Sequence, residues 1–257
     1  MTAILAPRAL ALLLFFMLTV TCAAESDHAR HGMPQPGVEL RIQPAVIPFM
    51  TPAAFPAPVV EVTIGDKGGY RFVVDTGMSG TVLIRKALAD ELGLREVGHA
   101  MVGDASGHGT RTVPLVTIDR MATGDLDLSS IVALAMEPNA DHAASIPDDL
   151  DGILGMQLFR ELLVTFDYPA AQIRIEPHGP DWVESAEILR FDQSKSAIEI
   201  QLGIGDQIVP FFVDSAHRGT LTLPMSYAGR LPLSEPLTSI APVATVSTTY
   251  TRSRSRL

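Results

Sequence analysis

Short apolar runs separated by glycine-containing turns dominate the chain between residues 59 and 175. Runs rich in valine, isoleucine and phenylalanine are typical of β-strands, and glycine between two such runs is typical of a tight turn. Strands are predicted at residues 60–64, 72–74, 82–84, 113–118, 126–136, 164–168 and 172–175. Short helices are predicted at residues 85–92, where Ala87, Leu88 and Leu92 have helical spacing, and at residues 157–163. The pattern predicts a mainly β protein.

One predicted turn carries an aspartate between two apolar runs. The run that ends at Val74 is followed by Asp75-Thr76-Gly77, and Val82 begins the next run. Strands on both sides would hold the Asp75 carboxyl in place, as catalysis requires. Taken alone, the tripeptide is a weak signal, because an aspartate commonly hydrogen-bonds to its own turn.

The same pattern occurs a second time, 139 positions later, as Asp214-Ser215-Ala216 after another apolar run. Upstream, residues 60–65 are matched with residues 198–203, which requires one extra residue before the second aspartate. Downstream, Ala89 falls on Ala228 and Leu92 on Leu231 at the common spacing. Similarity over about 35 residues predicts a duplicated unit, with a site where the two aspartates meet.

The duplicated aspartate motif resembles that of the pepsin-like and retropepsin-like aspartic peptidases, in particular their bacterial members. Residues 151–155, Asp-Gly-Ile-Leu-Gly, add to the resemblance, which covers residues 55–231. It implies a fold of β-barrel lobes, with Asp75 and Asp214 as the catalytic pair. By the same resemblance, Ile153, Leu154 and Gly155 form the strand behind the first aspartate loop.

The resemblance also implies supporting roles in the site. Thr76 and Ser215 would brace the two loops through their hydroxyls, and the Gly77 amide would hold a carboxylate, with Ala216 in the corresponding place of the second loop. A mobile hairpin, the flap, closes over substrate in this family. Its tip resembles Ala105, Ser106, Gly107, His108 and Gly109, which an ordinary hairpin turn explains equally well.

The ends of the chain differ in composition from the middle. Residues 1–24 have one charge, an apolar run and small residues near Ala24, which predicts a signal peptide and an exported, periplasmic or secreted protein. Acylation of Cys22 as a lipoprotein is disfavoured, because the residues before it lack the usual small side chain. The apolar run is also short for a membrane anchor. Residues 25–58 are predicted to be a proline-rich arm with no core of its own.

The remaining boundaries follow from the repeat. Residues 59–175 are predicted to be a first lobe, residues 176–196 a linker, and residues 197–233 a partial second lobe. Residues 234–257, rich in proline, serine and threonine, are expected to be a disordered tail or to be left by truncation or a frameshift. No second apolar pair followed by glycine is present to support Asp214, so the second lobe is expected to be truncated.

Composition narrows the possible chemistry. The single cysteine lies in the predicted signal peptide, which excludes disulfides and a cysteine nucleophile from the mature protein. A net charge of −10 argues against nucleic acid partners. Asp148, Asp149 and Asp151 lack the spacing of a calcium loop and are predicted to be solvated. The sequence implies no metal, nucleotide or redox cofactor.

The first functional hypothesis is an aspartic endopeptidase in which a carboxyl pair activates water for hydrolysis of a peptide or protein substrate. In a variant of it, a homodimer pairs Asp75 with its symmetry mate. The alternative is a catalytically inert binding or structural domain that keeps the peptidase fold. The short second lobe favours the alternative, whereas an aspartate in both copies favours the enzyme. His217, beside Asp214, either tunes that acid or is an exposed histidine without a role.

Overall fold

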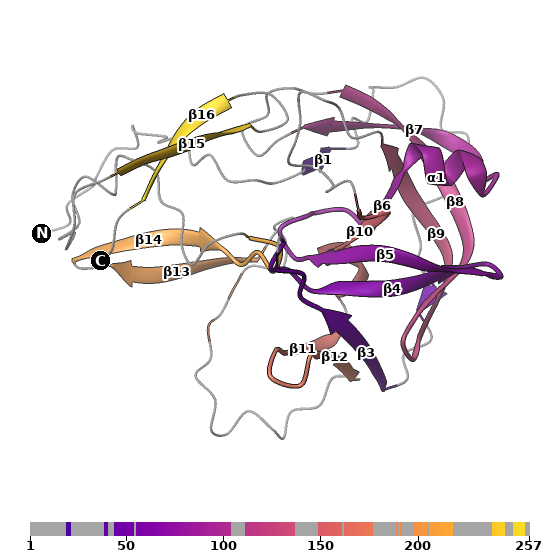
Figure 1. Ribbon diagram of the computed structural model, residues 1–257, viewed down its shortest axis with the longest axis horizontal. Coiled ribbons are helices and arrows are strands. Elements are labelled where there is room, and N and C mark those ends of the chain that lie inside the picture. Colours follow the sequence, from indigo (N-terminus) through magenta and orange to yellow (C-terminus); the bar gives the residue numbers. More distant parts are fainter. Residues whose placement is uncertain are drawn as a thin grey trace, which may run out of the picture.

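A computed structural model describes residues 19–21, 39–40, 44–53, 55–103, 111–136, 149–160, 162–176, 189, 191, 198–204, 206–217, 238–244 and 249–254. The flap candidate at residues 105–109 and the repeat residues Ala228 and Leu231 lie outside these ranges. Figure 1 shows the described strands arranged as one large sheet and two separate hairpins.

The large sheet contains the strands predicted between residues 60 and 175, together with strands in residues 1–58, where none was predicted. Two short strands come first, β1 (Thr19–Thr21) and β2 (Glu39–Leu40), which pair with β7 and β9. The others, in chain order, are β3 (Ala45–Met50), β4 (Val59–Ile64), β5 (Lys67–Asp75), β6 (Val82–Arg85), β7 (Arg95–Gly103), β8 (Arg111–Thr123), β9 (Leu126–Met136), β10 (Gly152–Gly155), β11 (Leu163–Asp167) and β12 (Gln172–Glu176). The protein is mainly β, as predicted.

Six of these strands close into a barrel. Neighbours pair in the order β4, β5, β10, β6, β9 and β8, and β8 returns to β4 where Ala122 pairs with Thr63. Closure removes the exposed edges that an open sheet of these strands would have. The barrel predicted for the first lobe is therefore confirmed.

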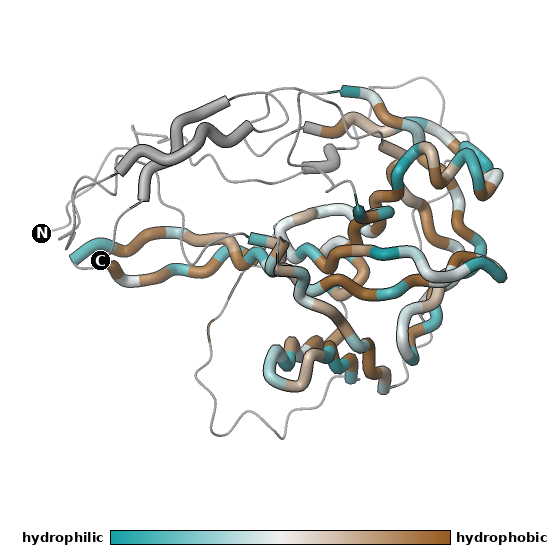
Figure 2. Tube along the Cα trace, viewed as in Figure 1, coloured by the Kyte–Doolittle hydropathy of each residue, from teal (hydrophilic) through white to brown (hydrophobic). Residues whose placement is uncertain are grey.

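The barrel strands supply two apolar cores from their opposite faces. Phe72 and Val74 of β5 belong to the larger core, whereas Val73 between them belongs to the second core. The same alternation occurs in β10, where Leu154 belongs to the larger core and Ile153 belongs to the second core. Strands buried on both faces read as continuous apolar runs, which explains the hydrophobic stretches along the barrel in Figure 2.

The predicted boundary between the arm and the first lobe is wrong at β3. This strand pairs with β4 and β12, and its Ala45, Ile47 and Phe49 side chains are buried in the larger core. The alternation of buried and exposed positions is regular, but Pro48 within it obscures the strand in the sequence. The arm assigned to residues 25–58 thus contributes a strand to the lobe.

The two predicted helices have different outcomes. Residues 85–92 form α1 (Lys86–Glu91), which buries Leu88 and Ala89, as predicted. Residues 157–163 do not form an α-helix. Only the 3₁₀ turn η1 (Met156–Leu158) forms, and Leu163 already belongs to β11. No helix in the described part of the chain is long and apolar enough to cross a membrane.

The second repeat forms a hairpin of β13 (Glu199–Ile204) and β14 (Gln207–Phe212), which leads to Asp214. Its register corrects the match made from sequence. Glu199 pairs with Phe212 in the same way as Val59 pairs with Val73. Glu199 of β13 therefore corresponds to Val59 of β4, whereas the sequence match would have placed Val59 two positions earlier, at residue 197. The extra residue therefore belongs to the first copy, where a register shift between Val62 and Ile64 absorbs it.

The expected tail contains a further hairpin. β15 (Thr238–Ala244) and β16 (Thr249–Arg254) pair antiparallel with each other. Pro242 lies within the irregularity between Ile240 and Val243, where the regular ladder is interrupted and a residue without an N–H donor is tolerated. This segment differs from the disordered tail that its composition suggested.

Gly152 is the closest packing point in the barrel. A Cβ atom at this position would lie 2.2 Å from Phe72 Cε1 and 2.4 Å from the Leu83 carbonyl oxygen. β10 can pass between β5 and β6 only because this residue has no side chain.

We expect Gly152→Ala to lower the thermal unfolding temperature by several °C, since overpacking a core costs about 1–3 kcal/mol. Gly203→Ala is the matched control, because the nearest atom to a Cβ there is Ile208 Cδ1 at 3.9 Å. Calorimetry of both variants makes the comparison. Equal unfolding temperatures would contradict the packing account.

Candidate active site

The first aspartate stands where β5 ends and the chain turns toward β6. Its Oδ1 atom accepts hydrogen bonds from the backbone N–H of Gly77 at 2.8 Å and of Met78 at 3.1 Å. The Met78 N–H also lies 3.2 Å from the Asp75 carbonyl oxygen. The turn therefore fixes the Asp75 carboxyl through its own backbone.

The second aspartate has the same local geometry. Asp214 Oδ1 accepts a hydrogen bond from the Ala216 N–H at 2.8 Å, and the His217 N–H lies 3.3 Å from the Asp214 carbonyl oxygen. The residue before each aspartate is held in the same way. The Val213 N–H donates to the Ile198 carbonyl oxygen at 2.9 Å, and the Val74 N–H donates to the Pro58 carbonyl oxygen at 2.9 Å. The two motifs are equivalent in structure as well as in sequence.

Four reciprocal hydrogen bonds join the two loops. The Thr76 N–H donates to Ser215 Oγ and the Ser215 N–H to Thr76 Oγ1, both at 3.0 Å. Each hydroxyl then donates across the junction at 2.7 Å, Thr76 to the Val213 carbonyl and Ser215 to the Val74 carbonyl. We call these four bonds the loop clasp. It is the bracing that the resemblance implied for Thr76 and Ser215.

The loop clasp brings the two carboxyls together. The side chains of Asp75 and Asp214 meet at Gly77. A Cβ atom at Gly77 would lie 2.9 Å from Asp214 Cγ and 3.1 Å from Asp75 Oδ1, so any side chain at this position would collide with the pair. The absence of a side chain at Gly77 is therefore a requirement of the paired arrangement.

The pKa of each carboxyl is raised. Burial is the largest cause of the raised pKa of Asp75, and the charge of Asp214 is the next. Burial also raises the pKa of Asp214, but the Ala216 N–H and the charge of His217 act against it. Two adjacent carboxyls cannot both ionise easily, so the pair holds one proton. The Gly77 and Met78 N–H groups oppose the rise at Asp75 in the same way, so the surroundings of the two carboxyls differ chiefly in the charge of His217 beside Asp214.

β10 supports the first loop from behind, as the resemblance implied. Gly155 pairs with Asp75 in the parallel register, and its N–H donates to the Thr81 carbonyl at 2.7 Å. The Met156 N–H donates to the Met78 carbonyl at 2.8 Å. A Cβ at Gly155 would lie 2.3 Å from the Gly80 carbonyl oxygen, which explains glycine at this position.

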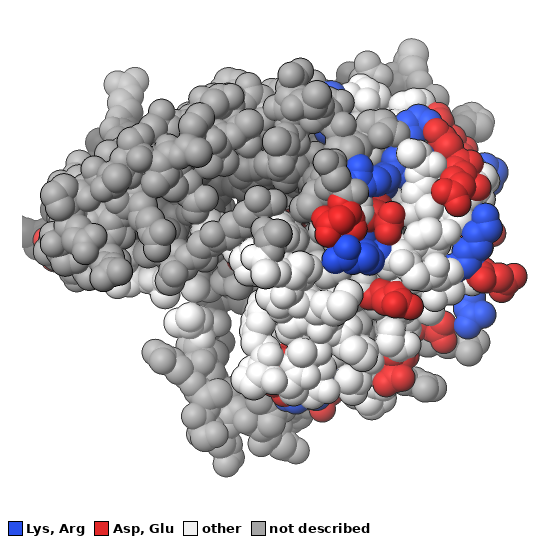
Figure 3. Space-filling model, viewed as in Figure 1, with Lys and Arg blue, Asp and Glu red and all other residues white. Residues whose placement is uncertain are grey.

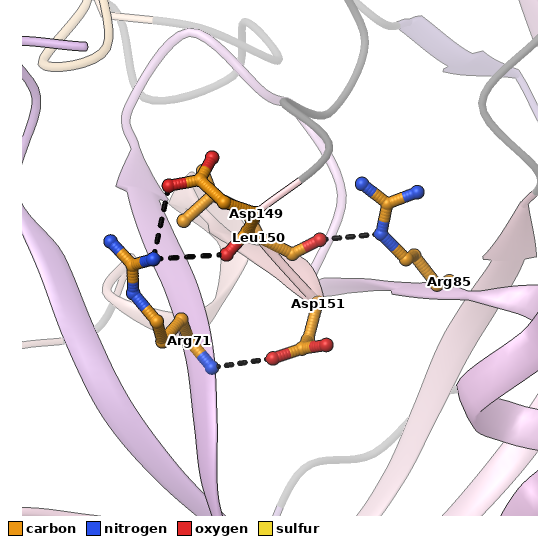
Figure 4. A network of polar contacts seen from close by, with 5 residues as sticks. All are labelled: Arg71, Arg85, Asp149, Leu150 and Asp151. Atoms are coloured by element: carbon orange, nitrogen blue, oxygen red, sulfur yellow. Dashed lines mark hydrogen bonds and ion pairs between the residues drawn. The ribbon is translucent and has the colours of Figure 1, made fainter. Parts of the chain in front are cut away.

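A network of charged side chains holds the segment that leads into β10 (Figure 4). The Arg71 side chain forms an ion pair with Asp149 at 3.0 Å, and the Arg71 N–H donates to Asp151 Oδ2 at 2.8 Å. On the other side, Arg85 Nε donates to the Leu150 carbonyl at 2.5 Å. Asp149 and Asp151 were predicted to lie in a solvated loop. The Asp149 side chain is 59% exposed, and both aspartates also connect the segment before β10 to β5.

The predicted site residues thus have distinct outcomes in the structure. It brings together seven of them around the paired carboxyls, namely Asp75, Thr76, Gly77, Gly155, Asp214, Ser215 and Ala216. Ile153 and Leu154 pair with Val73 and Val74 beside the first loop. The flap tip lies outside the described residues, although β7 and β8 form the two arms of a hairpin that leads to it.

Sequence reasoning missed several residues of the site. Met78 is buried beneath the first loop and contacts β10, and Gly152 is as constrained as Gly155. A signal for Gly152 existed, because a glycine inside a buried apolar strand indicates close backbone approach. No sequence pattern indicated that Arg71 would bind Asp149 and Asp151.

A family model described as aspartyl protease matches residues 60–158. This range contains the first aspartate loop and β10, the two features of the site that the barrel supplies. Residues 60–158 are therefore similar in sequence to the aspartyl proteases. A comparison with curated proteins finds no match.

The aspartyl protease match supports a peptidase-type function. It ends at residue 158, so Asp214 and the loop clasp rest on the structure alone. Within the described residues, no group of three or more His, Cys, Asp or Glu side chains is placed to hold a metal ion.

Because the pKa of Asp75 is raised, we predict that Asp75→Asn increases the thermal stability of the protein by an amount that depends on pH. When folding raises the pKa of an acid, the free energy of unfolding falls as the pH rises. The fall begins near the pKa in the unfolded state, about 4, and ends above the pKa in the folded state. Asparagine keeps the acceptor oxygen for Gly77 and Met78, donates to Asp214 and never ionises. We expect the variant to unfold a few °C higher than the wild type at pH 7, with the gain lost near pH 3.

Thermal unfolding monitored by circular dichroism at several pH values tests this expectation. Asp66→Asn, in the exposed turn between β4 and β5, is the control for losing one negative charge. A gain from Asp75→Asn that is the same at pH 3 and pH 7 would show that the pair shares no proton.

Proposed function

We propose that the protein is an aspartic-type endopeptidase in which Asp75 and Asp214 of one chain activate water. The observation that carries the proposal is that the two carboxyls, 139 positions apart in the sequence, meet at Gly77 where the loop clasp joins their loops. Both carboxyls have raised pKa values, so a single shared proton gives one general acid and one general base side by side.

Hydrolysis follows from this single proton. The ionised carboxyl takes a proton from water as the water oxygen attacks the peptide carbonyl carbon, while the protonated carboxyl gives its proton to the carbonyl oxygen. The carboxyl that acted as the acid then takes back one proton from a hydroxyl of the tetrahedral intermediate. At the same time, the other carboxyl gives its proton to the amide nitrogen. The C–N bond breaks to give a carboxylic acid and an amine. Water is the only co-reactant, and the pair ends with one proton.

The proposed roles differ between the two loops. Asp75, whose pKa is raised by burial and by the Asp214 charge, is the proposed acid. Asp214 is the proposed base, because the charge of His217 favours its ionised form, whereas backbone N–H groups favour the ionised form of both carboxyls. Thr76 and Ser215 set the distance between the carboxyls through the loop clasp.

A peptide or protein substrate would bind in extended form beneath the hairpin of β7 and β8, recognised mainly through its backbone. The apolar run and small residues of segment 1–24 support export as the setting of this activity. The acidic composition favours neither nucleic acid nor an anionic membrane as a partner.

Substituting either aspartate tests the proposal. We expect Asp75→Asn and Asp214→Asn each to lower kcat by at least about 100-fold, because each removes one member of the acid–base pair. Initial rates on a mixed peptide library, from acidic to neutral pH, give the measurement. Asp66→Asn serves as the control.

Other outcomes of this experiment point elsewhere. If only the Asp75 substitution abolished cleavage, Asp75 would pair with its copy in a homodimer, and the proposed role of Asp214 would fall. If the folded wild-type protein cleaved no peptide at any pH, the chain would be a binding or structural domain with a peptidase fold.

The residue after each motif gives a further prediction. Met78 follows the first motif and His217 the second, and the charge of His217 lowers the pKa of Asp214. In His217→Met, the pKa of Asp214 rises, so we expect the acidic limb of kcat/KM to move to higher pH. The pH profile of His99→Met, an exposed histidine of β7, is the control. Superimposable profiles for His217→Met and wild type would contradict this role.

A further inference from the structure

The hairpin of β7 and β8 has an inner face that packs on the second core. Ala100 of β7 and Val113 of β8 pair with each other, and both belong to that core. Two residues nearer the hairpin tip, Val102 pairs with Arg111, and Val102 is fully buried in the same core. Residues that pair directly across an antiparallel ladder share a face of the sheet. The Arg111 side chain therefore leaves β8 on the inner face of the hairpin.

The two aspartate loops border the same core. Met78, directly after the first motif, belongs to it, and Ala216 of the second motif packs against it. Val73 of β5 is also a member, and Asp75 follows two positions later, where the side chains of a strand point to the same face. Arg111 and Asp75 therefore face one core, the first from the hairpin and the second from its loop.

The guanidinium of Arg111 is poorly provided with acceptors. Its Nη2 atom lies 2.6 Å from the Sδ atom of Met136, a buried residue of the second core, and a thioether sulfur is a weak acceptor. The Nε atom of Arg111 is buried and has no hydrogen-bond partner among the described residues. Burial lowers the pKa of Arg111, because apolar surroundings disfavour the charged form. Arginine nevertheless stays protonated in proteins, so this position keeps a positive charge.

Other arginines of the lobe are paired with acids. Arg71, Arg120 and Arg174 each form an ion pair with an aspartate, at 3.0, 3.3 and 2.9 Å. On the face drawn in Figure 3, blue and red side chains lie largely side by side. In the described part of the chain, no such pair joins Arg111 to a carboxylate, although cations that are removed from water are normally paired. The position therefore suits a carboxylate that another molecule supplies.

We propose that Arg111 is a specificity-determining residue of the proposed peptidase site, where its guanidinium binds a carboxylate of the substrate. The carboxylate belongs to a Glu or Asp side chain or to the C-terminus of the peptide. This inference rests on the proposed function, in which an extended substrate lies beneath the hairpin that carries Arg111. A guanidinium can donate two parallel hydrogen bonds to one carboxylate, which neutralises the charge and satisfies the unused donors.

Peptide pairs with amidated C-termini, which differ only by Glu against Gln at one position around the cleaved bond, test the proposal. We expect the wild type to prefer Glu at one position by about 10-fold or more in kcat/KM, because hydrogen bonds between charged groups are the strong ones. Arg111→Met should abolish the preference. Arg111→Lys should keep part of it, since lysine has the charge but not the planar fork. A ratio that is the same in wild type and Arg111→Met would overturn the proposal without touching the peptidase assignment.

A second set of peptides, with free against amidated C-termini, distinguishes the two sources of the carboxylate. An Arg111-dependent preference for the free C-terminus would support the terminal carboxyl, and a preference for Glu would support the side chain. Absence of both preferences would overturn the proposal.

The pH dependence of the preference distinguishes a charge contact from a structural role. Glutamate of the substrate becomes protonated below about pH 4, so the Glu preference of the wild type should disappear as the pH falls through this range. A structural effect of Arg111 would not follow the pKa of a substrate group. A Glu preference that stayed constant from pH 3 to pH 7 would contradict the proposed contact.

Two further variants serve as controls. Arg120→Met removes an arginine whose side chain is 67% exposed on the same strand, and it should leave the preference unchanged. Glu137, which follows Met136 in the sequence, lies outside the described residues, so Glu137→Gln tests for a pair within the chain. Equal losses of unfolding temperature in Arg111→Met and Glu137→Gln, with no Glu preference in the wild type, would overturn the proposal. If Arg111→Met proves too unstable to assay, Arg111→Gln replaces it, and retention of the full preference would overturn the proposal.

A binding assay covers the case in which the wild type cleaves nothing. Calorimetric titration of the Asp75→Asn protein with the same peptides, with and without Arg111→Met, then provides the measurement. An Arg111-dependent preference for the peptides with a carboxylate would support Arg111 as its binding residue, while the peptidase assignment would fail. Equal affinities, or no binding to either protein, would overturn the inference.

Discussion

The loop clasp is the interaction on which the site depends. Thr76 and Ser215 each use a backbone N–H and a hydroxyl to bind the opposite loop, so neither loop is complete alone. A buried donor or acceptor that loses its partner costs about 1–3 kcal/mol, so loss of either residue would leave several such groups unpaired. The clasp holds the two carboxyls so close together that two negative charges there would repel, which favours a single shared proton.

Glycine makes the close approach possible on both sides of the first loop. Gly77 leaves room for the Asp214 carboxyl in front, and Gly155 leaves room for β10 behind. Arg71 and Arg85 then hold the chain that leads into β10 through Asp149, Asp151 and the Leu150 carbonyl. The position of Asp75 is thus determined by the barrel, and that of Asp214 by the clasp.

Sequence could predict the paired aspartates because their motif occurs twice with the same flanking residue types. The sequence could not determine how β4 aligns with β13, the strands that precede the two aspartates. A shift of two residues keeps every side chain on the same face of the strand, so both alignments fit the apolar pattern. β3 was missed because Pro48 lies within it and proline is rare in the interior of a strand. His217 lies three positions after Asp214 in the sequence, so its place beside that acid could be predicted, whereas the contacts of Arg71 with Asp149 and Asp151 form only in the tertiary structure.

Titration of the two carboxyls tests the central claim, that Asp75 and Asp214 of one chain share a proton. The measurement is ¹³C NMR of the aspartate side-chain carboxyl carbons of the intact protein between pH 2 and pH 10. The account predicts two widely separated steps for the pair, with the upper step lost in Asp214→Asn. If both carboxyls titrated in a single range near pH 4 and independently of each other, the paired site would be contradicted.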